Sequence, residues 1–177
     1  MKAKLKDSAI PATATSPSAK PLSPRGTVAP AFVRGMLAGA LHDGHDAGAL
    51  LAAVGIDAAC LVDDGARVPL ADYAALYNHL NAVLDDEAFA LLSSPMRAGC
   101  FEFLCRATIT APQLGEALAR AIRFLHAVLP DMRVALKRDG AYATLVIAEE
   151  RPLLVDRIFA YEWLLRLLHG LSCWLVG

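Results

Sequence analysis

Along most of the chain, large apolar residues recur every three or four positions, the spacing that places side chains on one face of a helix. This pattern predicts a first helix at about 31–41. A short second helix should start with Asp46 as its N-cap and end at Gly55. Pro69 is suited to the first position of a third helix, because that position needs no backbone N–H. The apolar stripe of this third helix is formed by Leu70, Tyr73, Tyr77, Leu80 and Leu84.

The middle of the chain contains three further segments with helical character. Ala88–Leu92 fits a short turn of helix. Gly99–Ile109 is ambiguous, because its aromatic residues favour a strand whereas its leucine and alanine tolerate a helix; we favour the helix. The pattern of a long helix begins at Thr110, which is placed as an N-cap with Gln113 three residues later, and ends at Pro130.

One part of the chain has the two-residue period of a strand. In residues 131–148, Val134 and Leu136 alternate with Arg133, Ala135 and Lys137, and a second run, Tyr142–Ile147, follows Asp139-Gly140, a pair that favours a tight hairpin turn. A single hairpin is only marginally stable on its own. We therefore expect it to belong to a small sheet that is incomplete in this chain and is completed by missing sequence or by a partner chain. The predicted fold class is α+β and mostly helical.

The last segment, about Leu153–Val176, is the most apolar of the chain. Its length approaches the roughly 20 residues that a membrane-spanning helix needs. However, Glu162, Arg166, His169 and Cys173 recur at helical spacing and form one polar stripe. A helix with such a stripe is typical of the interior of a soluble protein, so we expect no membrane span.

Composition favours one folded domain behind a distinct leader. The chain has 177 residues, of which 56% are hydrophobic, which is enough for a core. Residues 1–30 are rich in proline and have no apolar period, so we expect a disordered leader without a signal peptide, followed by the domain at 31–177. The whole chain has a formal net charge of −1 and residues 1–29 carry +4, which leaves −5 for the rest. This acidic body disfavours binding to nucleic acid.

The cysteines and histidines do not match a known metal or catalytic motif. The spacings of Cys60, Cys100, Cys105 and Cys173 fit no zinc pattern, and we expect free thiols in a cytoplasmic protein. The run His42–Asp46 offers two imidazoles and two carboxylates, but its glycine and its capping aspartate favour a polar turn. No nucleotide-binding, metalloprotease or hydrolase motif occurs. We therefore expect neither a metal nor a cofactor.

Candidate ligand-binding residues are polar side chains that interrupt apolar segments. In the polar stripe of the last helix, Glu162, Arg166 and His169 are placed to form one wall of an apolar cleft. Arg106 is flanked by small and apolar residues, and its guanidinium group matches the geometry of a carboxylate. His126 completes the set of candidates. An exposed polar face or a seam between helices is the more common explanation for such a stripe.

The order of five short stretches resembles the amino-terminal effector domain of AraC-type bacterial transcription regulators, in the arabinose-binding-like subgroup. The stretches are Leu50–Asp57, Arg67–Tyr73, Gly99–Leu104, Thr110–Leu118 and the hairpin after Pro130. The resemblance covers about 31–177. It implies a cytoplasmic sensor, not an enzyme, that binds a small metabolite such as an organic or amino acid and forms a homodimer. In such regulators a carboxy-terminal pair of helix-turn-helix units binds DNA.

No helix-turn-helix pattern occurs before Gly177, so we expect this chain to be a fragment that reaches DNA only through a domain it lacks. Three alternatives to a sensor follow from the residues themselves. The chain is a protein interaction module without a ligand, a small enzyme that uses the thiol of Cys100 or Cys105, or a protein anchored in the membrane by residues 153–176.

Overall fold

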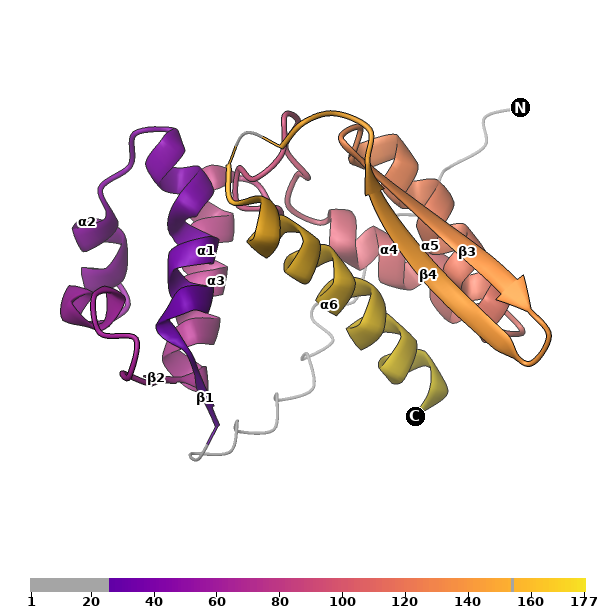
Figure 1. Ribbon diagram of the computed structural model, residues 1–177, viewed down its shortest axis with the longest axis horizontal. Helices are drawn as coiled ribbons and strands as arrows, with labels where there is room; N and C mark the ends of the chain where they lie inside the picture. The colour runs from indigo at the N-terminus through magenta and orange to yellow at the C-terminus, as the bar shows by residue number, and fades with distance from the viewer. Residues whose placement is uncertain (1–25, 154) are drawn as a thin grey trace, which may run out of the picture.

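The structure is a computed structural model that describes residues 26–153 and 155–177 (Figure 1). Its elements in chain order are β1 (Thr27–Val28), α1 (Pro30–His42), α2 (Ala47–Ala52), the 3₁₀ turn η1 (Ala58–Leu61), β2 (Val68–Pro69), α3 (Leu70–Leu84), α4 (Cys100–Ile109), α5 (Leu114–Val128), β3 (Met132–Asp139), β4 (Tyr142–Glu149) and α6 (Arg157–Val176). The predicted α+β, mostly helical fold is confirmed. Of the predicted leader, residues 1–25 lie outside the described residues, whereas Thr27–Val28 pair with β2.

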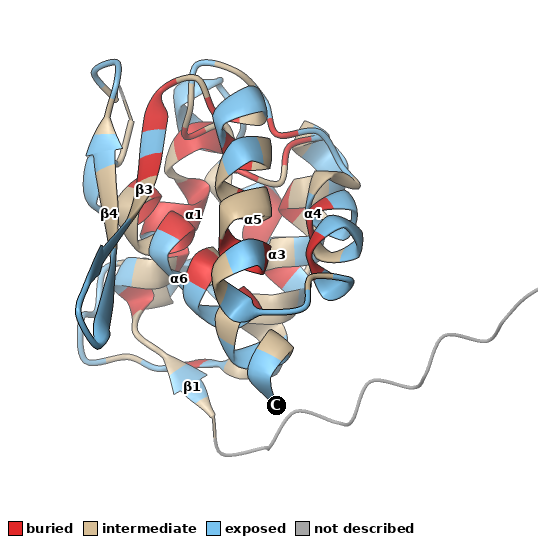
Figure 2. Cartoon of the chain, turned by 90° about the vertical axis from the view of Figure 1, so that its right-hand side faces the viewer, coloured by how far each residue is buried: buried red, intermediate tan, exposed pale blue. Residues whose placement is uncertain are grey.

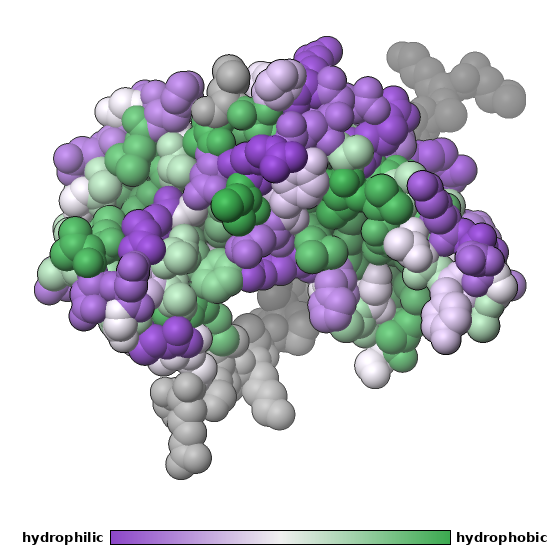
Figure 3. All heavy atoms as spheres, in the orientation of Figure 1, coloured by the Kyte–Doolittle hydropathy of each residue, from purple (hydrophilic) through white to green (hydrophobic). Residues whose placement is uncertain are grey.

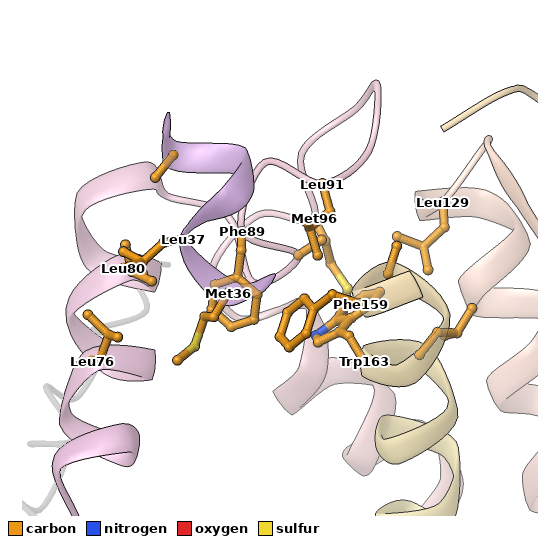
Figure 4. Close-up of a cluster of buried hydrophobic side chains, with 14 of the residues drawn as sticks. Met36, Leu37, Leu76, Leu80, Phe89, Leu91, Met96, Leu129, Phe159 and Trp163 are labelled. Carbon is orange, nitrogen blue, oxygen red and sulfur yellow. The ribbon is translucent and has the colours of Figure 1, made fainter. Parts of the chain in front are cut away.

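Helix α6 lies between two groups of elements (Figure 1). Helices α1, α2 and α3 pack together on one side, and α4, α5 and the β3–β4 hairpin pack on the other. The buried residues gather where the inner faces of α1, α3, α5 and α6 meet (Figure 2). In this core Phe159 and Trp163 of α6 reach toward Met36 of α1 and Phe89 (Figure 4).

Two glycines allow α1 to approach its neighbours closely. A Cβ atom at Gly35 would overlap the ring of Phe159, and one at Gly39 would overlap the backbone carbonyl of Phe89. Both positions are in the middle of α1, where glycine costs helix stability relative to alanine. The close packing of α1 against α6 and against the loop after α3 therefore depends on these glycines.

The amino-terminal helices form where the sequence patterns predict them, although α2 ends at Ala52 and not at Gly55. The carboxylate of Asp46 caps α2 by accepting a hydrogen bond of 2.6 Å from the amide of Ala49, as predicted. Pro69 stands one position earlier than predicted, because it is the N-cap residue of α3 and also part of β2. The most deeply buried residues of α3 are Leu80, which belongs to the predicted stripe, and Leu76, which does not.

The predicted helical turn at Ala88–Leu92 is wrong. Phe89 and Ala90 have left-handed backbone conformations, with φ of 57° and 54°, which a right-handed helix excludes. The buried carboxylate of Asp86 accepts hydrogen bonds from the amides of Ala88, Ala90 and Met96, at 2.7 to 2.9 Å. The amides of Ala88 and Ala90 therefore donate to the Asp86 side chain and not to a helical carbonyl. The segment is an irregular loop.

The predicted start of the long helix at Thr110 is also wrong. Most of Gly99–Ile109 is helical, as favoured from the sequence: helix α4 runs from Cys100 to Ile109, with Gly99 as its N-cap residue and Thr110 as its C-cap residue. Helix α5 begins only at Leu114, with Gln113 as its N-cap residue. The hydroxyl of Thr110 instead accepts a hydrogen bond of 3.0 Å from Arg120, which joins the end of α4 to α5.

The hairpin and the last helix form in the segments where the sequence predicts them, but the bounds of the helix differ. Strands β3 and β4 pair from Met132↔Glu149 to Asp139↔Tyr142, and Gly140 turns the chain with φ of 55°. Helix α6 starts at Arg157 rather than near Leu153, because Asp156 caps it. No helix among residues 26–153 and 155–177 is both long and apolar enough to cross a membrane.

Candidate functional site

The structure disperses most of the predicted candidate residues. Arg106 lies on the exposed face of α4, where it pairs with Glu102 one turn earlier at 2.6 Å. His126 faces β3: its Nε2 atom lies 2.9 Å from the carbonyl oxygen and 3.2 Å from the amide nitrogen of Val134. Arg106 is therefore a surface residue, and the His126 ring connects α5 to β3 of the hairpin through its contact with the Val134 backbone.

The polar stripe of α6 forms, but its members have different surroundings. His169 and Cys173 are exposed and contact each other, with 3.6 Å between Nε2 and Sγ. Glu162 and Arg166 stand 3.6 Å apart at their closest carboxylate and guanidinium atoms. The Arg166 guanidinium also lies over the ring of Phe32, with 3.9 Å between its carbon and the ring centroid. Among the predicted ligand-binding candidates, Arg166 is the one that lines a cavity identified among the described residues.

That cavity has a volume of about 250 Å³, and we call it the aromatic pocket. Its walls come from α3, the loop after α3, α4 and α6. The lining residues are Tyr73, Tyr77, Phe89, Phe101, Phe159, Trp163, Arg166 and Leu167. Phe159 and Trp163 are buried and form its floor, whereas Phe101 and Arg166 are more exposed and form its rim.

Helical spacing explains how four residues of α6 reach the aromatic pocket. Trp163 follows Phe159 by four residues, and Arg166 and Leu167 follow Trp163 by three and four, so all four share one face. The ring of Phe89 packs edge-on against Tyr77, with 4.8 Å between ring centroids and 82° between the planes. This edge-on geometry is a favourable arrangement for two aromatic rings.

The two tyrosines of the pocket remain neutral hydrogen-bonding groups. Burial raises the pKa of Tyr73 to about 12; the Arg166 charge lowers it, and Tyr77 and Glu162 raise it. Burial is also the main cause that raises the pKa of Tyr77, against hydrogen bonding by the side chains of Asn81 and Trp163, which lowers it. At neutral pH the pocket therefore presents two phenol hydroxyls and one guanidinium cation.

A second, larger cavity of about 550 Å³ lies between the end of α1, the loop after α3 and the segment before α6, and we call it the polar cavity. Its lining includes His42, Arg97, Asp131 and Arg151. The buried Asp131 carboxylate is already engaged by the amide and the hydroxyl of Ser93, at 2.6 and 2.7 Å. Arg97 is paired outside the cavity lining, with Asp85 at 2.8 Å. The charged groups of the polar cavity are thus largely satisfied within the protein.

The thiols do not have the surroundings of catalytic cysteines. Burial raises the pKa of Cys100 and of Cys105, and neighbouring carboxylates, led by Glu87 for Cys100 and Glu102 for Cys105, raise it further. A nucleophilic cysteine needs the opposite, a cationic neighbour that stabilises the thiolate. Across the described part of the chain, no three histidine, cysteine, aspartate or glutamate residues gather as a metal site would require.

Comparison with known families adds to this geometry. A family model described as the arabinose-binding domain of AraC transcription regulators, amino-terminal, matches residues 44–177. The chain belongs to this family. None of the curated proteins and none of the solved structures matches it. The arabinose-binding domain family is a regulatory ligand-binding family and not a family of enzymes, and its match includes every residue that lines the aromatic pocket.

For this arabinose-binding domain, the sequence patterns point to one residue of the aromatic pocket, Arg166, and not to the aromatic ones. Tyr73 and Tyr77 belong to the predicted core stripe of a helix, and no pattern marks Trp163. The signal in the sequence that points to the pocket is residue type. Tyr73, Tyr77 and Trp163 occupy inner helix faces, where a leucine would fill the space without a polar group. Each carries a polar tip that needs a partner when it is buried.

Proposed function

We propose that this chain is the effector-sensing part of an AraC-type regulator and that it binds a small-molecule effector in the aromatic pocket. One observation carries the proposal: the pocket lies where α3 of one group of elements, α4 of the other and the central α6 meet. It combines apolar walls with a few polar groups, the usual composition of a small-molecule site.

The position of the pocket provides a mechanism. An effector that contacts α3, α4 and α6 together binds best to the arrangement in which these helices surround it. Binding shifts the conformational equilibrium toward that arrangement. The size of the shift is set by how much more tightly the effector binds this arrangement than the one in which the helices are apart. In a complete cytoplasmic regulator, the shift would change the grip of a helix-turn-helix domain on DNA.

Dimerisation is the second part of this proposed function, and the β4 edge supports it. Tyr142–Ala148 carries no charge, whereas β3 carries Arg133, Lys137 and Arg138. Within the described residues, the outer edge of β4 has no backbone partner. Leu145, Val146 and Ile147 are only half-buried, and apolar atoms gather between α6 and the hairpin on this face (Figure 3). Two copies can join such edges into one sheet without opposing like charges.

The test of the pocket uses its own tryptophan. The chain has two tryptophans, so Trp174→Phe leaves Trp163 as the single reporter. We expect the apolar anionic dye 1-anilinonaphthalene-8-sulfonate to quench Trp163 in a saturable, one-to-one manner. A collection of small metabolites is then screened for compounds that displace the dye and raise the melting temperature, as ligands of the folded state must.

Two matched variants on α4 localise the binding. Phe101→Glu places a carboxylate on the pocket rim, and Phe103→Glu places one on the same helix at a residue that does not line the pocket and is 72% exposed. We expect the first variant to weaken binding of the dye and of any screened ligand, and the second to leave both unchanged. Equal affinities in the two variants, or no displacing compound, would contradict the proposal.

A further inference from the structure

We propose that the aromatic pocket is specific for a small carboxylate with an apolar or aromatic body, whose carboxylate is held by Arg166. This inference rests on the proposed function, because it assigns a ligand class to the same pocket. It departs from the sugar named in the family description, and three features of the pocket carry it.

The first feature is the free edge of the Arg166 guanidinium. Its carbon lies over the Phe32 ring, 3.9 Å from the ring centroid, a cation–π contact that uses the charge of the group and none of its N–H donors. The carboxylate of Glu162 is 3.6 Å away, beyond hydrogen-bond distance. Arg166 donates no hydrogen bond to any described residue, in contrast to Arg34, Arg106 and Arg120. Arg166 thus keeps a fork of donors whose geometry matches a carboxylate, beside an aromatic ring that stabilises its charge.

The second feature is that the described wall residues carry no carboxylate or carboxamide side chain. No aspartate, glutamate, asparagine or glutamine is among the described residues that line the aromatic pocket. Its polar groups are the Arg166 cation, two tyrosine hydroxyls and the indole N–H of Trp163. Trp163 and Tyr77 already hydrogen-bond each other, so Arg166 and the Tyr73 hydroxyl are the donors that a ligand would meet. A sugar or an amino acid also brings hydroxyl or ammonium donors, which would find few acceptors here. A simple carboxylate brings acceptors alone.

The third feature is size and polarity. A volume of about 250 Å³ is below the ~300–1,000 Å³ of sites for drug-sized ligands, so the ligand is small. Phe89, Phe159 and Trp163 are buried, and a ring or a short alkyl chain that packs against them is stabilised by burial. Arg166 stands at the rim, so the carboxylate would remain near solvent and lose little hydration.

The experiment measures binding by isothermal titration calorimetry with three probes: phenylacetate, its uncharged counterpart phenylacetamide, and L-arabinose. We expect phenylacetate to bind at least tenfold more tightly than phenylacetamide, and arabinose not to bind. Arg166→Gln should weaken phenylacetate by about tenfold to a hundredfold, the loss of a charged hydrogen-bonded pair, and leave phenylacetamide unchanged. Unchanged binding of the amide also shows that the variant is folded.

Further variants separate a carboxylate clamp from a general effect of charge. Arg166→Lys keeps the charge without the planar fork and should give an intermediate affinity. Glu162→Gln removes the competing carboxylate and should strengthen phenylacetate binding several-fold. Arg106→Gln serves as the control, because Arg106 and Glu102 form the same kind of pair on α4 outside the pocket. It should change nothing.

Three results would overturn the inference. If the acid and the amide bind equally and Arg166→Gln affects neither, the carboxylate assignment is wrong while the pocket remains a binding site. If arabinose binds and phenylacetate does not, the pocket is a polyol site. If no probe binds and Phe101→Glu has no effect on dye binding, the inference and the proposed function both fail.

Discussion

At the scale of single residues, Asp86 holds together the loop that carries Phe89 into the aromatic pocket. Its carboxylate is 97% buried and accepts hydrogen bonds from three amides, whereas Asp85 beside it is exposed and pairs with Arg97. We expect Asp86→Asn to lower the free energy of unfolding by about 2 kcal/mol, since an amide nitrogen replaces an acceptor of buried N–H groups. Urea unfolding measures the loss.

The neighbouring variant Asp85→Asn is the matched control. It removes the same charge from an exposed ion pair and should cost less than ~0.5 kcal/mol, because such pairs contribute little. Asparagine also tolerates the left-handed backbone of Asp85. Similar losses for both variants would mean that the charge of this loop, and not the hydrogen bonds of Asp86, stabilises it.

At the scale of elements, the packing of α1 depends on the absence of a side chain at Gly39. A methyl group there would meet the backbone of Phe89 and Ala90, which cannot rotate away as a side chain can. We therefore expect Gly39→Ala to destabilise the protein by about 1–3 kcal/mol, the usual cost of overpacking. Gly170 of α6 has open space instead, and Gly170→Ala should stabilise by about 0.5–1 kcal/mol. Thermal unfolding of the two variants compares them, and shifts in the same direction would contradict this account.

Elements could be predicted from the sequence where local preferences decide them. The helical spacing in 31–41 and the Asp139-Gly140 turn are local signals, and α1 and the hairpin follow them. The helix prediction for Ala88–Leu92 is wrong because two of its amides bond to Asp86, a contact that apolar spacing does not encode. Strands β1 and β2 have two residues each, too few to display a period. Thr110 has the residue type of an N-cap, but residue type alone does not show that the preceding helix ends at this position.

At the scale of the whole molecule, the aromatic pocket could not be predicted from the sequence. Its lining comes from four segments between Tyr73 and Leu167, which meet only through the tertiary fold. Arg166 was a candidate because its polar side chain interrupts an apolar helix. Of the other predicted candidates, Glu162 stands beside Arg166 without lining the pocket. Arg106, His126 and His169 share the same local property, but α4, α5 and the far end of α6 turn them toward solvent or the hairpin.

Self-association through β4 is the prediction that concerns the molecule as a whole. The backbone N–H of Glu150 donates a hydrogen bond to the carbonyl of Asp131, so Asp131 and Glu150 are a hydrogen-bonded pair just beyond the open end of the β3–β4 ladder. Along an antiparallel ladder, hydrogen-bonded and non-hydrogen-bonded residue pairs alternate. By that alternation, the N–H groups of the paired residues Arg138 and Ala143 point away from the hairpin, toward its two outer edges. Ala143→Pro therefore blocks the β4 edge without removing a ladder bond, and Arg138→Pro does the same to the β3 edge.

Sedimentation velocity over a range of concentrations distinguishes the two edges. We expect the unsubstituted chain to form dimers, Ala143→Pro to remain monomeric, and Arg138→Pro to dimerise like the unsubstituted chain, because the cations of β3 repel a second copy. Circular dichroism confirms that both variants are folded. A monomeric unsubstituted chain, or an Ala143→Pro variant that still dimerises, would show that the uncharged edge of β4 is not where two copies meet.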